Sequence, residues 1–302
     1  MKHPIDPALP IGLFDSGMGG LTVLNALKQL MPNENYIYLG DTARLPYGTK
    51  SPETVMHYAL NATKELVNRQ VKLMIIACNT ASSVALPVLQ KQCAPIPVLG
   101  VIQPSAQHAL EKLPKGSIAV LATEGTVKSR AYSKTILAQD PNRIIYEWPC
   151  SLLVALAEEG WHKGTVVEDI LKKMLSPLWE QLDKNQPKAL LLGCTHFPVL
   201  ISAIQNVSDE NTLIIDSACS VAQAAQKLLQ SKHLLTTSTQ PGLVRYLVTD
   251  GIERFQRVGK FFFHDANTEI SPELITLELN HKLQDFEALS LLSGTPPKAG
   301  EA

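Results

Sequence analysis

The sequence alternates between short apolar runs and longer stretches in which apolar residues recur at helical spacing. The apolar runs predict strands at Ile11–Asp15, Tyr36–Gly40, Leu73–Ala77, Pro97–Val101, Ser117–Ala122, Arg143–Glu147, Ala189–Gly193, Thr212–Asp216 and Leu243–Thr249. The helical spacing predicts helices over Leu21–Met31, Pro52–Gln70, Thr126–Leu137, Thr165–Leu182 and Ser217–Gln230. This alternation is typical of parallel strands joined by helices, so the predicted fold class is α/β.

About nine strands are more than one simple sheet requires, so we expect two α/β domains with mainly parallel sheets. The predicted boundaries are the links near Gln103-Pro104 and around 206–211. If the chain then returns to the first sheet, the first domain comprises residues 1–102 and 211–279, and the second comprises 103–210. Residues 280–302 end in a small, polar, proline-rich segment, for which we expect a flexible tail.

Two short patterns occur twice and suggest that the two domains are pseudo-symmetric. A strand followed by cysteine and a polar residue is found at Cys78 and at Cys194. A strand followed by Asp-Ser and a small residue is found at Asp15-Ser16-Gly17 and at Asp216-Ser217-Ala218. Coincidences of this length are common between strand ends, so the patterns are a hint of duplication and no more.

Composition and charge exclude several classes of protein. Of the 302 residues, 45% are hydrophobic and 18% are charged, which is normal for a globular chain with a buried core. Lys plus Arg number 27 against 28 for Asp plus Glu, so nothing indicates a nucleic-acid or anionic-membrane partner. The chain start lacks a signal-like apolar stretch, and no run approaches the roughly 20 apolar residues of a membrane span. We therefore expect a cytoplasmic protein.

Cysteine is the residue type that points to chemistry. The five cysteines include no close C-x-x-C pair, so a disulfide framework is not expected. We interpret Cys93, Cys150 and Cys219 as structural residues. Cys78 and Cys194, in contrast, each end a predicted strand just before a predicted helix, at the sheet edge where open α/β folds bind ligands. A helix N-terminus lowers the pKa of a thiol, and the thiolate is the reactive form.

Two thiols in matching positions suggest a pair that faces one substrate from opposite sides. Inversion of a carbon centre by proton transfer needs such an arrangement. Each cysteine taken alone is more typical of a strand-end core residue, but the repetition favours the functional interpretation. Asn79, Thr80 and Thr195 can orient a substrate by hydrogen bonds, and His196 follows the second thiol closely.

Three loops at other predicted strand ends can contribute to the same site. The segment Asp15-Ser16-Gly17-Met18-Gly19-Gly20 is either a tight turn or a loop whose backbone amides bind an anion. It does not match the dinucleotide-binding pattern, which requires glycine where Thr22 stands, or the P-loop pattern, which requires a lysine after the last glycine. Pro46-Tyr47-Gly48 is either a turn or a wall of amides and an aromatic ring. Thr123 and Thr126 offer hydroxyls for a second carboxylate.

Other chemistries fit these residues less well. Zinc bound by Cys78, Cys194 and His196 would lack an obvious fourth ligand. A Cys-His hydrolase would leave the second cysteine unexplained. No lysine stands out as an anchor for pyridoxal phosphate.

The motifs together lead to a family. They are Asp15-Ser16-Gly17-x-Gly19-Gly20, Gly40-Asp41-Thr42-x-Arg44-x-Pro46-Tyr47-Gly48, Cys78-Asn79-Thr80-Ala81, Gly193-Cys194-Thr195-His196-Phe197-Pro198 and Thr249-Asp250-Gly251-x-x-Arg254-Phe255. With these segments, from about Ile11 to about Leu279, the chain resembles the bacterial glutamate racemases of the cofactor-independent aspartate/glutamate racemase superfamily. The segment around Cys194 favours glutamate over aspartate racemases.

The resemblance implies two α/β domains with the active site in the cleft between them, no cofactor, and a homodimer. It implies that Cys78 deprotonates D-glutamate and Cys194 deprotonates L-glutamate, assisted by Asp15 and His196 respectively. The implied substrate contacts are Asp15, Ser16, Pro46, Tyr47, Gly48, Asn79, Thr80, Thr123, Thr126, Thr195 and His196. The product D-glutamate would serve peptidoglycan synthesis.

Physical chemistry is consistent with this expectation. Removal of an α-proton builds negative charge beside a carboxylate, and a closed site lined by amide and hydroxyl donors stabilises that charge. Two acid/base residues also explain how both enantiomers are accepted. A racemase or isomerase acting on aspartate or another dicarboxylate, and an inactive amino-acid-binding homologue, remain as alternatives; retention of both cysteines argues against the last.

Overall fold

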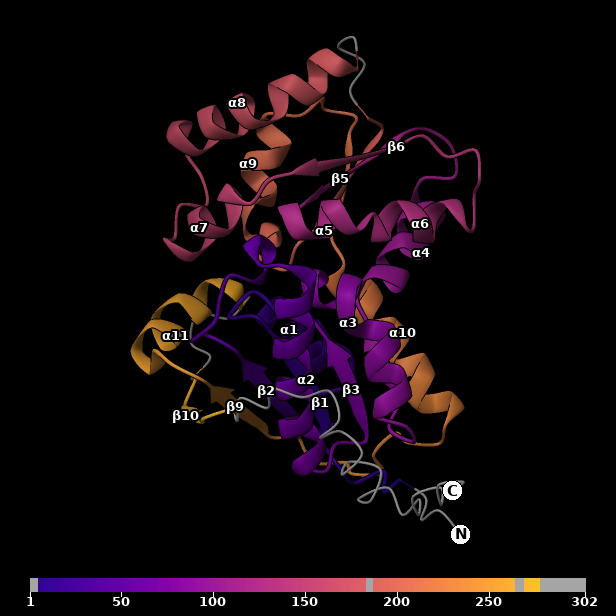
Figure 1. The fold of residues 1–302 in the computed structure, drawn as a ribbon, viewed down its shortest axis with the longest axis vertical. Coiled ribbons are helices and arrows are strands. Elements are labelled where there is room, and N and C mark those ends of the chain that lie inside the picture. The colour runs from indigo at the N-terminus through magenta and orange to yellow at the C-terminus, as the bar shows by residue number, and fades with distance from the viewer. Residues whose placement is uncertain (1–4, 183–186, 264–268, 278–302) are drawn as a thin grey trace, which may run out of the picture.

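The computed structural model describes residues 5–182, 187–263 and 269–277. It contains two α/β domains stacked end to end, each built on its own sheet (Figure 1). The predicted fold class is therefore confirmed. The tail predicted for residues 280–302 lies outside the described residues. None of the helices described is long and apolar enough to cross a membrane.

The first domain is built on a six-stranded sheet in the order β10-β9-β2-β1-β3-β4, with every neighbouring pair parallel. Its strands are β1 (Ile11–Asp15), β2 (Tyr36–Gly40), β3 (Leu73–Ile76), β4 (Val98–Gly100), β9 (Val244–Val248) and β10 (Pro272–Leu274). Its helices are α1 (Leu21–Leu30), α2 (Pro52–Asn68), α3 (Asn79–Gln92), α10 (Ala218–Ser231) and α11 (Ile252–Gly259). Strand β10 was not among the predicted strands.

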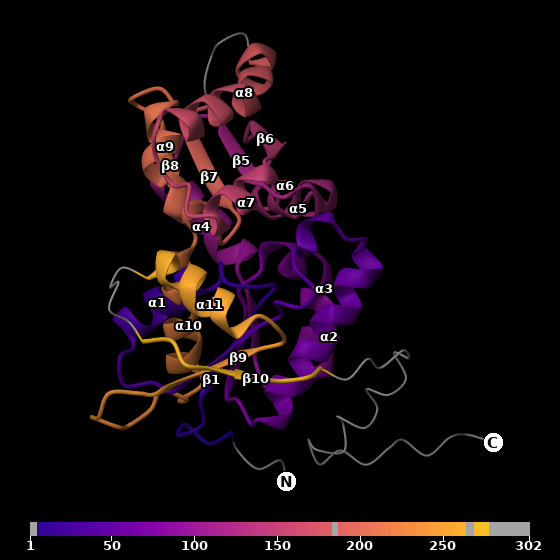
Figure 2. The ribbon, with the colours of Figure 1, turned by 90° about the vertical axis from the view of Figure 1, so that its left-hand side faces the viewer.

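Both faces of this sheet are covered, which explains its near-continuous apolar strands. In β1, Ile11 and Leu13 pack on the side of α1 and α10, whereas Phe14 packs on the side of α2 and α3. Figure 2 shows these helix pairs on opposite sides of the strands. Alternate residues of each strand therefore belong to different apolar cores.

The second domain is built on a four-stranded parallel sheet in the order β6-β5-β7-β8. Its strands are β5 (Ile118–Ala122), β6 (Ile145–Pro149), β7 (Ala189–Gly193) and β8 (Leu213–Ile215). Its helices are α4 (Ile102–Lys112), α5 (Glu124–Ser129), α6 (Ala131–Leu137), α7 (Leu152–Glu158), α8 (Thr165–Gln181) and α9 (Ile201–Asn206). The single helix predicted over Thr126–Leu137 is wrong, because Arg130 adopts a left-handed conformation with φ of 57° and separates α5 from α6.

The strand order reveals which sequence pattern reflects duplication. In chain order, the first four strands of each domain are arranged second, first, third, fourth. Cys78 and Cys194 follow β3 and β7, the third strand of each set, so the two cysteines occupy equivalent positions. The repeated Asp-Ser pattern does not, since Asp15 ends a first strand and Asp216 follows a fourth.

The chain passes into the second domain after β4 and returns after β8. The second domain was predicted to end at residue 210, but strand β8 lies after that residue and pairs with β7 in the second sheet, so this boundary is wrong. The predicted domain boundaries otherwise remain a prediction.

A buried ion pair lies at the end of the first sheet opposite the second domain. Lys72 Nζ is 2.5 Å from Glu34 Oε2 and donates to the carbonyl of Pro7 at 2.6 Å. Glu34 also accepts a hydrogen bond of 2.8 Å from the amide of Thr236. Both charged side chains are almost completely buried, so each depends on the other for compensation.

We expect Lys72→Met to destabilise the protein by about 3–5 kcal/mol, because it leaves the Glu34 carboxylate buried without its counter-charge. Urea unfolding followed by circular dichroism measures this loss. Lys172→Met is the control, since Lys172 forms an exposed pair with Asp169 at 3.6 Å and should change stability by less than about 0.5 kcal/mol. Equal midpoints for the two variants would contradict the expectation.

Candidate active site

The carboxyl ends of the two sheets meet around one cavity with about 380 Å³ of space not filled by protein. Eleven of the thirteen residues proposed from the sequence line it: Ser16, Pro46, Tyr47, Gly48, Cys78, Asn79, Thr80, Thr123, Cys194, Thr195 and His196. Asp15 and Thr126 lie immediately behind this lining, where each contacts a lining threonine. Gly17, Leu45, Val154 and Glu158 complete the wall. Gly17 belongs to the glycine-rich loop that was expected at the site, whereas the other three were not among the proposed site residues. The structure thus brings together residues from five strand ends.

Cys78 is the N-cap residue of α3 and is 5% exposed. Its sulfur accepts from the amide of Ala81 at 3.5 Å and donates to Ser16 Oγ at 3.7 Å. Burial raises the pKa of Cys78 to about 12, and the nearby charge of Asp15 acts in the same direction. The lowered pKa predicted from the helix N-terminus is therefore wrong for this thiol, because the loss of hydration outweighs one amide hydrogen bond.

Cys194 ends β7 in a different setting. A 3₁₀ turn, η2 (Phe197–Leu200), follows it in place of the predicted α-helix start. Cys194 Sγ is 3.9 Å from Nδ1 of His196, whose Nε2 is 3.0 Å from Oε1 of Glu158. Burial alone would lower the pKa of His196, but its hydrogen bonds to Cys194 and Glu158 raise that pKa to about 10. At neutral pH the imidazolium supplies the positive charge that a neighbouring thiolate requires.

Glu158, at the end of α7, is the main residue that the sequence interpretation missed. It is 5% exposed and accepts from Arg254 Nη2 at 3.1 Å through its second oxygen. Burial by itself raises the pKa of Glu158, but the hydrogen bonds from His196 and Arg254 outweigh it and lower the pKa. The sequence offered one signal for this residue: Glu158 is a charged residue directly after the apolar stretch 152–157.

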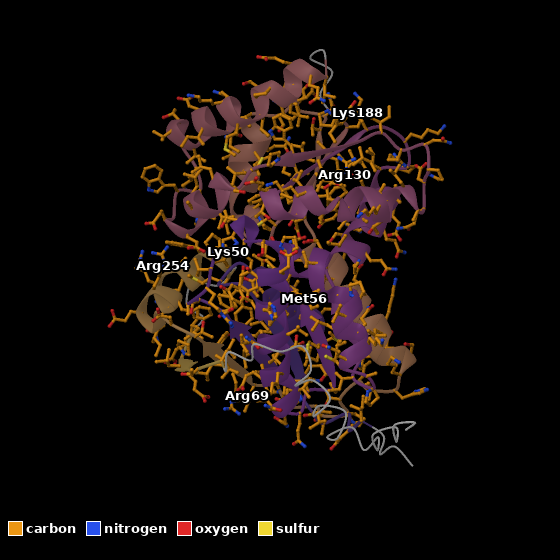
Figure 3. The ribbon with its side chains drawn as sticks, in the orientation of Figure 1. Lys50, Met56, Arg69, Arg130, Lys188 and Arg254 are labelled. Carbon is orange, nitrogen blue, oxygen red and sulfur yellow. The ribbon has the colours of Figure 1, made fainter. Side chains whose placement is uncertain are left out.

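Arg254 belongs to α11 of the first domain, so its bond to Glu158 crosses the domain junction. Figure 3 shows Arg254 at the level where the two domains meet, with Arg69 and Lys188 towards the outer ends of the first and second domain. Cys194, His196, Glu158 and Arg254 thus form a continuous chain of polar contacts from the cavity to the edge of the junction.

Asp15 connects the glycine-rich loop with the loop that carries the second thiol. Its Oδ2 accepts from the amide of Gly17 at 3.0 Å, and its Oδ1 accepts from the hydroxyl of Thr195 at 3.5 Å. Burial raises the pKa of Asp15, and the charge of His196 opposes this increase. Asp15 is completely buried, so it influences the cavity through these contacts and through its charge.

Three threonines join the domains on the other side of the cavity. Thr80 Oγ1 of the first domain lies 2.9 Å from Oγ1 of Thr123 and 3.2 Å from Oγ1 of Thr126, both of the second domain. Gly48 permits this contact, because a Cβ there would lie 2.6 Å from the Cβ of Thr123. Gly19 does the same near the second thiol, where a Cβ would lie 2.4 Å from Thr195 Oγ1. The two glycines let the domains approach each other closely.

Tyr47 is held from behind by the buried carboxylate of Asp41. Its hydroxyl donates to Asp41 Oδ2, and Arg44 Nε and Thr249 Oγ1 bind the same carboxylate at 2.7 Å and 2.9 Å. The predicted aromatic wall is therefore a rigid part of the cavity. Among the residues described, no cluster of three or more His, Cys, Asp or Glu side chains is arranged to hold a metal ion.

Paired thiols from equivalent strands, one with its proton retained by burial and one beside an imidazolium, can act as acid and base on opposite faces of a bound carbon centre. The fold and this site define the class of two-domain α/β racemases.

Comparisons with known proteins identify the family within this class. The sequence profile of the Asp/Glu/Hydantoin racemase family matches residues 19–225. Glutamate racemase of Geobacter metallireducens is 43% identical over 256 residues, which are 85% of this chain and 93% of that protein. The chain belongs to this family, and within it to the glutamate racemases.

Solved structures agree in fold over nearly the whole chain. Glutamate racemase of Francisella tularensis in complex with D-glutamate has a TM-score of 0.82 and 38% identity, covering 90% of this chain and 99% of that one. The enzyme of Thermus thermophilus in complex with β-chloro-D-alanine has a TM-score of 0.79 and 35% identity, covering 91% and 100%. The protein is therefore an enzyme of the amino-acid racemase type.

We expect Glu158→Gln to lower the pKa of His196 from about 10 towards its ordinary value near 6.5, because the imidazolium loses its anionic partner. NMR titration of the histidine ring signals in the substrate-free protein measures this change. Glu159→Gln is the matched control, since Glu159 is exposed and contacts Arg254 instead of His196. An unchanged His196 titration in Glu158→Gln would show that the pair does not set its protonation.

Proposed function

We propose that the protein interconverts L- and D-glutamate by proton transfer at the α-carbon, with Cys78 and Cys194 as the two acid/base residues. The observation that carries the proposal is that the two thiols leave equivalent strands of the two sheets and line one cavity in opposite electrostatic settings. Glutamate as the substrate is supported by the glutamate racemases to which the chain is related and by the D-glutamate bound in one of them.

In the L-to-D direction, Cys194 takes the α-proton of L-glutamate and Cys78 gives its own proton to the opposite face. His196, protonated and held by Glu158, places a positive charge 3.9 Å from the sulfur of Cys194, which favours proton abstraction by that thiol. Cys78, with a pKa of about 12, carries the proton it must deliver. In the D-to-L direction the two thiols exchange roles, and Asp15 assists Cys78.

The remaining cavity residues bind the substrate and stabilise the charge that develops on it. We assign this role to Asp15, Ser16, Pro46, Tyr47, Gly48, Asn79, Thr80, Thr123, Thr126, Thr195 and His196. A side-chain amide donor of Asn79 is buried and has no partner among the described residues, so it is available for a carboxylate oxygen. Donors fixed in a dry site stabilise a developing anion more than water does.

The wider setting of the reaction follows from its product. We propose that the enzyme works in the cytoplasm, without cofactor or metal, and supplies D-glutamate for peptidoglycan synthesis. We expect neither nucleic acid nor membrane as a partner, and we propose that the chain forms a homodimer. Size-exclusion chromatography with light scattering tests the last point: a mass near twice the 33.0 kDa of one chain is expected, and the mass of a single chain would refute it.

We expect the purified protein to racemise L-glutamate in deuterated water without added pyridoxal phosphate. Circular dichroism follows the loss of chirality, and mass spectrometry of the separated enantiomers follows α-deuterium. At early times deuterium should appear in D-glutamate and not in the recovered L-glutamate, because different thiols remove and deliver the proton. Early deuterium in both enantiomers would contradict the two-thiol mechanism, and turnover of aspartate alone would contradict the substrate assignment.

Cys78→Ala and Cys194→Ala should each reduce racemisation to below about a hundredth of the wild-type rate, since each removes one acid/base residue of the mechanism. Both variants should still bind glutamate in isothermal titration calorimetry. Cys93→Ala is the matched control, because Cys93 is also buried, has its pKa raised to about 12 by burial, and lies outside the cavity. Near-normal racemisation by either active-site variant would refute its role.

A further inference from the structure

Tyr132 lies on α6 of the second domain and is completely buried. Its ring packs against the backbone that precedes the second thiol: a Cβ at Gly193 would lie 3.0 Å from Cε2 of Tyr132. The ring is therefore held within the second domain, directly beneath the end of β7.

The hydroxyl of Tyr132 reaches across the domain junction. It donates to Oδ1 of Asn79 at 2.7 Å, and Asn79 is the first residue of α3 in the first domain. Burial raises the pKa of Tyr132 well above its ordinary value, so the hydroxyl keeps its proton and remains a donor. A tyrosine hydroxyl can donate or accept; here it donates to Oδ1 of Asn79, so the contact turns Nδ2 of the amide away from Tyr132.

The other atom of that amide lacks a partner. Asn79 lines the cavity and is 3% exposed, and its Nδ2 makes no hydrogen bond with any described residue. Buried donors are almost always satisfied, so an orphan donor at the wall of a cavity indicates that a ligand acceptor completes it. A carboxylate oxygen is such an acceptor.

We infer that Tyr132 is a positioning residue, whose hydroxyl holds the Asn79 amide so that Nδ2 faces the α-carboxylate of the substrate. The inference rests on the proposed function. Asn79 directly follows Cys78, which acts at the α-carbon in that proposal, so the carboxylate beside it is the one attached to the α-carbon. In the opposite amide orientation, Oδ1 would face that carboxylate and repel it.

The role extends to the chemical step. When the α-proton leaves, negative charge passes onto the α-carboxylate, and a donor already aimed at it becomes more valuable in the transition state than in the bound substrate. Loss of the Tyr132 hydroxyl should therefore lower kcat as well as raise KM for both enantiomers. A residue that only supported the fold would change the amount of active enzyme and leave KM unchanged.

Tyr132→Phe tests this directly, because it removes the hydroxyl and keeps the ring. We expect kcat/KM to fall about tenfold or more, since one donor of this kind contributes a factor of about 100 or more when it is removed altogether. Tyr36→Phe is the matched control: Tyr36 is equally buried, and its hydroxyl lies 3.0 Å and 2.9 Å from the carbonyl oxygens of Leu27 and Met31, away from the cavity. Its kcat/KM should remain within about twofold of wild type, because the same deletion is made outside the site.

A double-mutant cycle with Asn79→Ala shows whether Tyr132 acts through the amide. In the Asn79→Ala background, Tyr132→Phe should cause almost no further loss, since the group that it positions has gone. Equal losses in both backgrounds, or full activity of Tyr132→Phe, would overturn the inference. Either result would leave the proposed function intact as long as Cys78→Ala is inactive, whereas an inactive wild-type enzyme would refute the proposed function itself.

Asn79→Asp provides a second test that does not require Tyr132 to be altered. With one carboxylate oxygen held by Tyr132, the other would stand where Nδ2 stands now and would face the substrate carboxylate. We therefore expect Asn79→Asp to bind glutamate more weakly than Asn79→Ala in calorimetric titration. Equal or tighter binding by Asn79→Asp would show that Nδ2 does not face the carboxylate.

Discussion

The removal of water from the junction between the two sheets is the constraint on which the site depends. In water each ionisable group would have a pKa close to its ordinary value. When the same groups are buried together, the pKa of each depends on its neighbours. Burial raises the pKa of both Cys78 and Asp15. His196 is buried as deeply and would lose its proton, but its hydrogen bonds to Cys194 and Glu158 reverse that tendency. The same dry environment therefore produces an acid on one side and a cationic partner on the other.

The two halves of the site are equivalent in backbone and different in charge. The first four strands of each domain have the same order in their sheets, which places Cys78 and Cys194 after corresponding strands. The surroundings of the two thiols differ. Cys78 is followed by a full helix and lies near Ser16 and Asp15, whereas Cys194 lies beside the imidazolium of His196, which is bound to Glu158. In the proposed reaction the two thiols exchange roles between the two directions, and their surroundings differ: burial raises the pKa of Cys78, whereas Cys194 lies beside a protonated imidazole.

Contacts across the junction make the site a property of the closed molecule. Tyr132 binds Asn79, Arg254 binds Glu158, and the hydroxyl of Thr80 meets those of Thr123 and Thr126. In each contact one partner comes from each domain. Opening the junction would break these contacts together, so the arrangement of the residues that line the cavity depends on the packing of one domain on the other.

Sequence alone determined most of the strands, the fold class and most of the residues that line the cavity, because buried parallel strands are continuous apolar runs and the residues that follow them must meet at one sheet edge. It also found Cys78 and Cys194 as a pair. It could not find Glu158, which lies on a helix and reaches His196 only through packing within the second domain. Nor could it find the contact of Tyr132 with Asn79, which exists only where the two domains pack together. Nor could it give the pKa of Cys78, since a helix N-terminus is visible in a sequence and desolvation is not. Tertiary structure decided these points because burial and contacts between distant segments exist only once both sheets are in place.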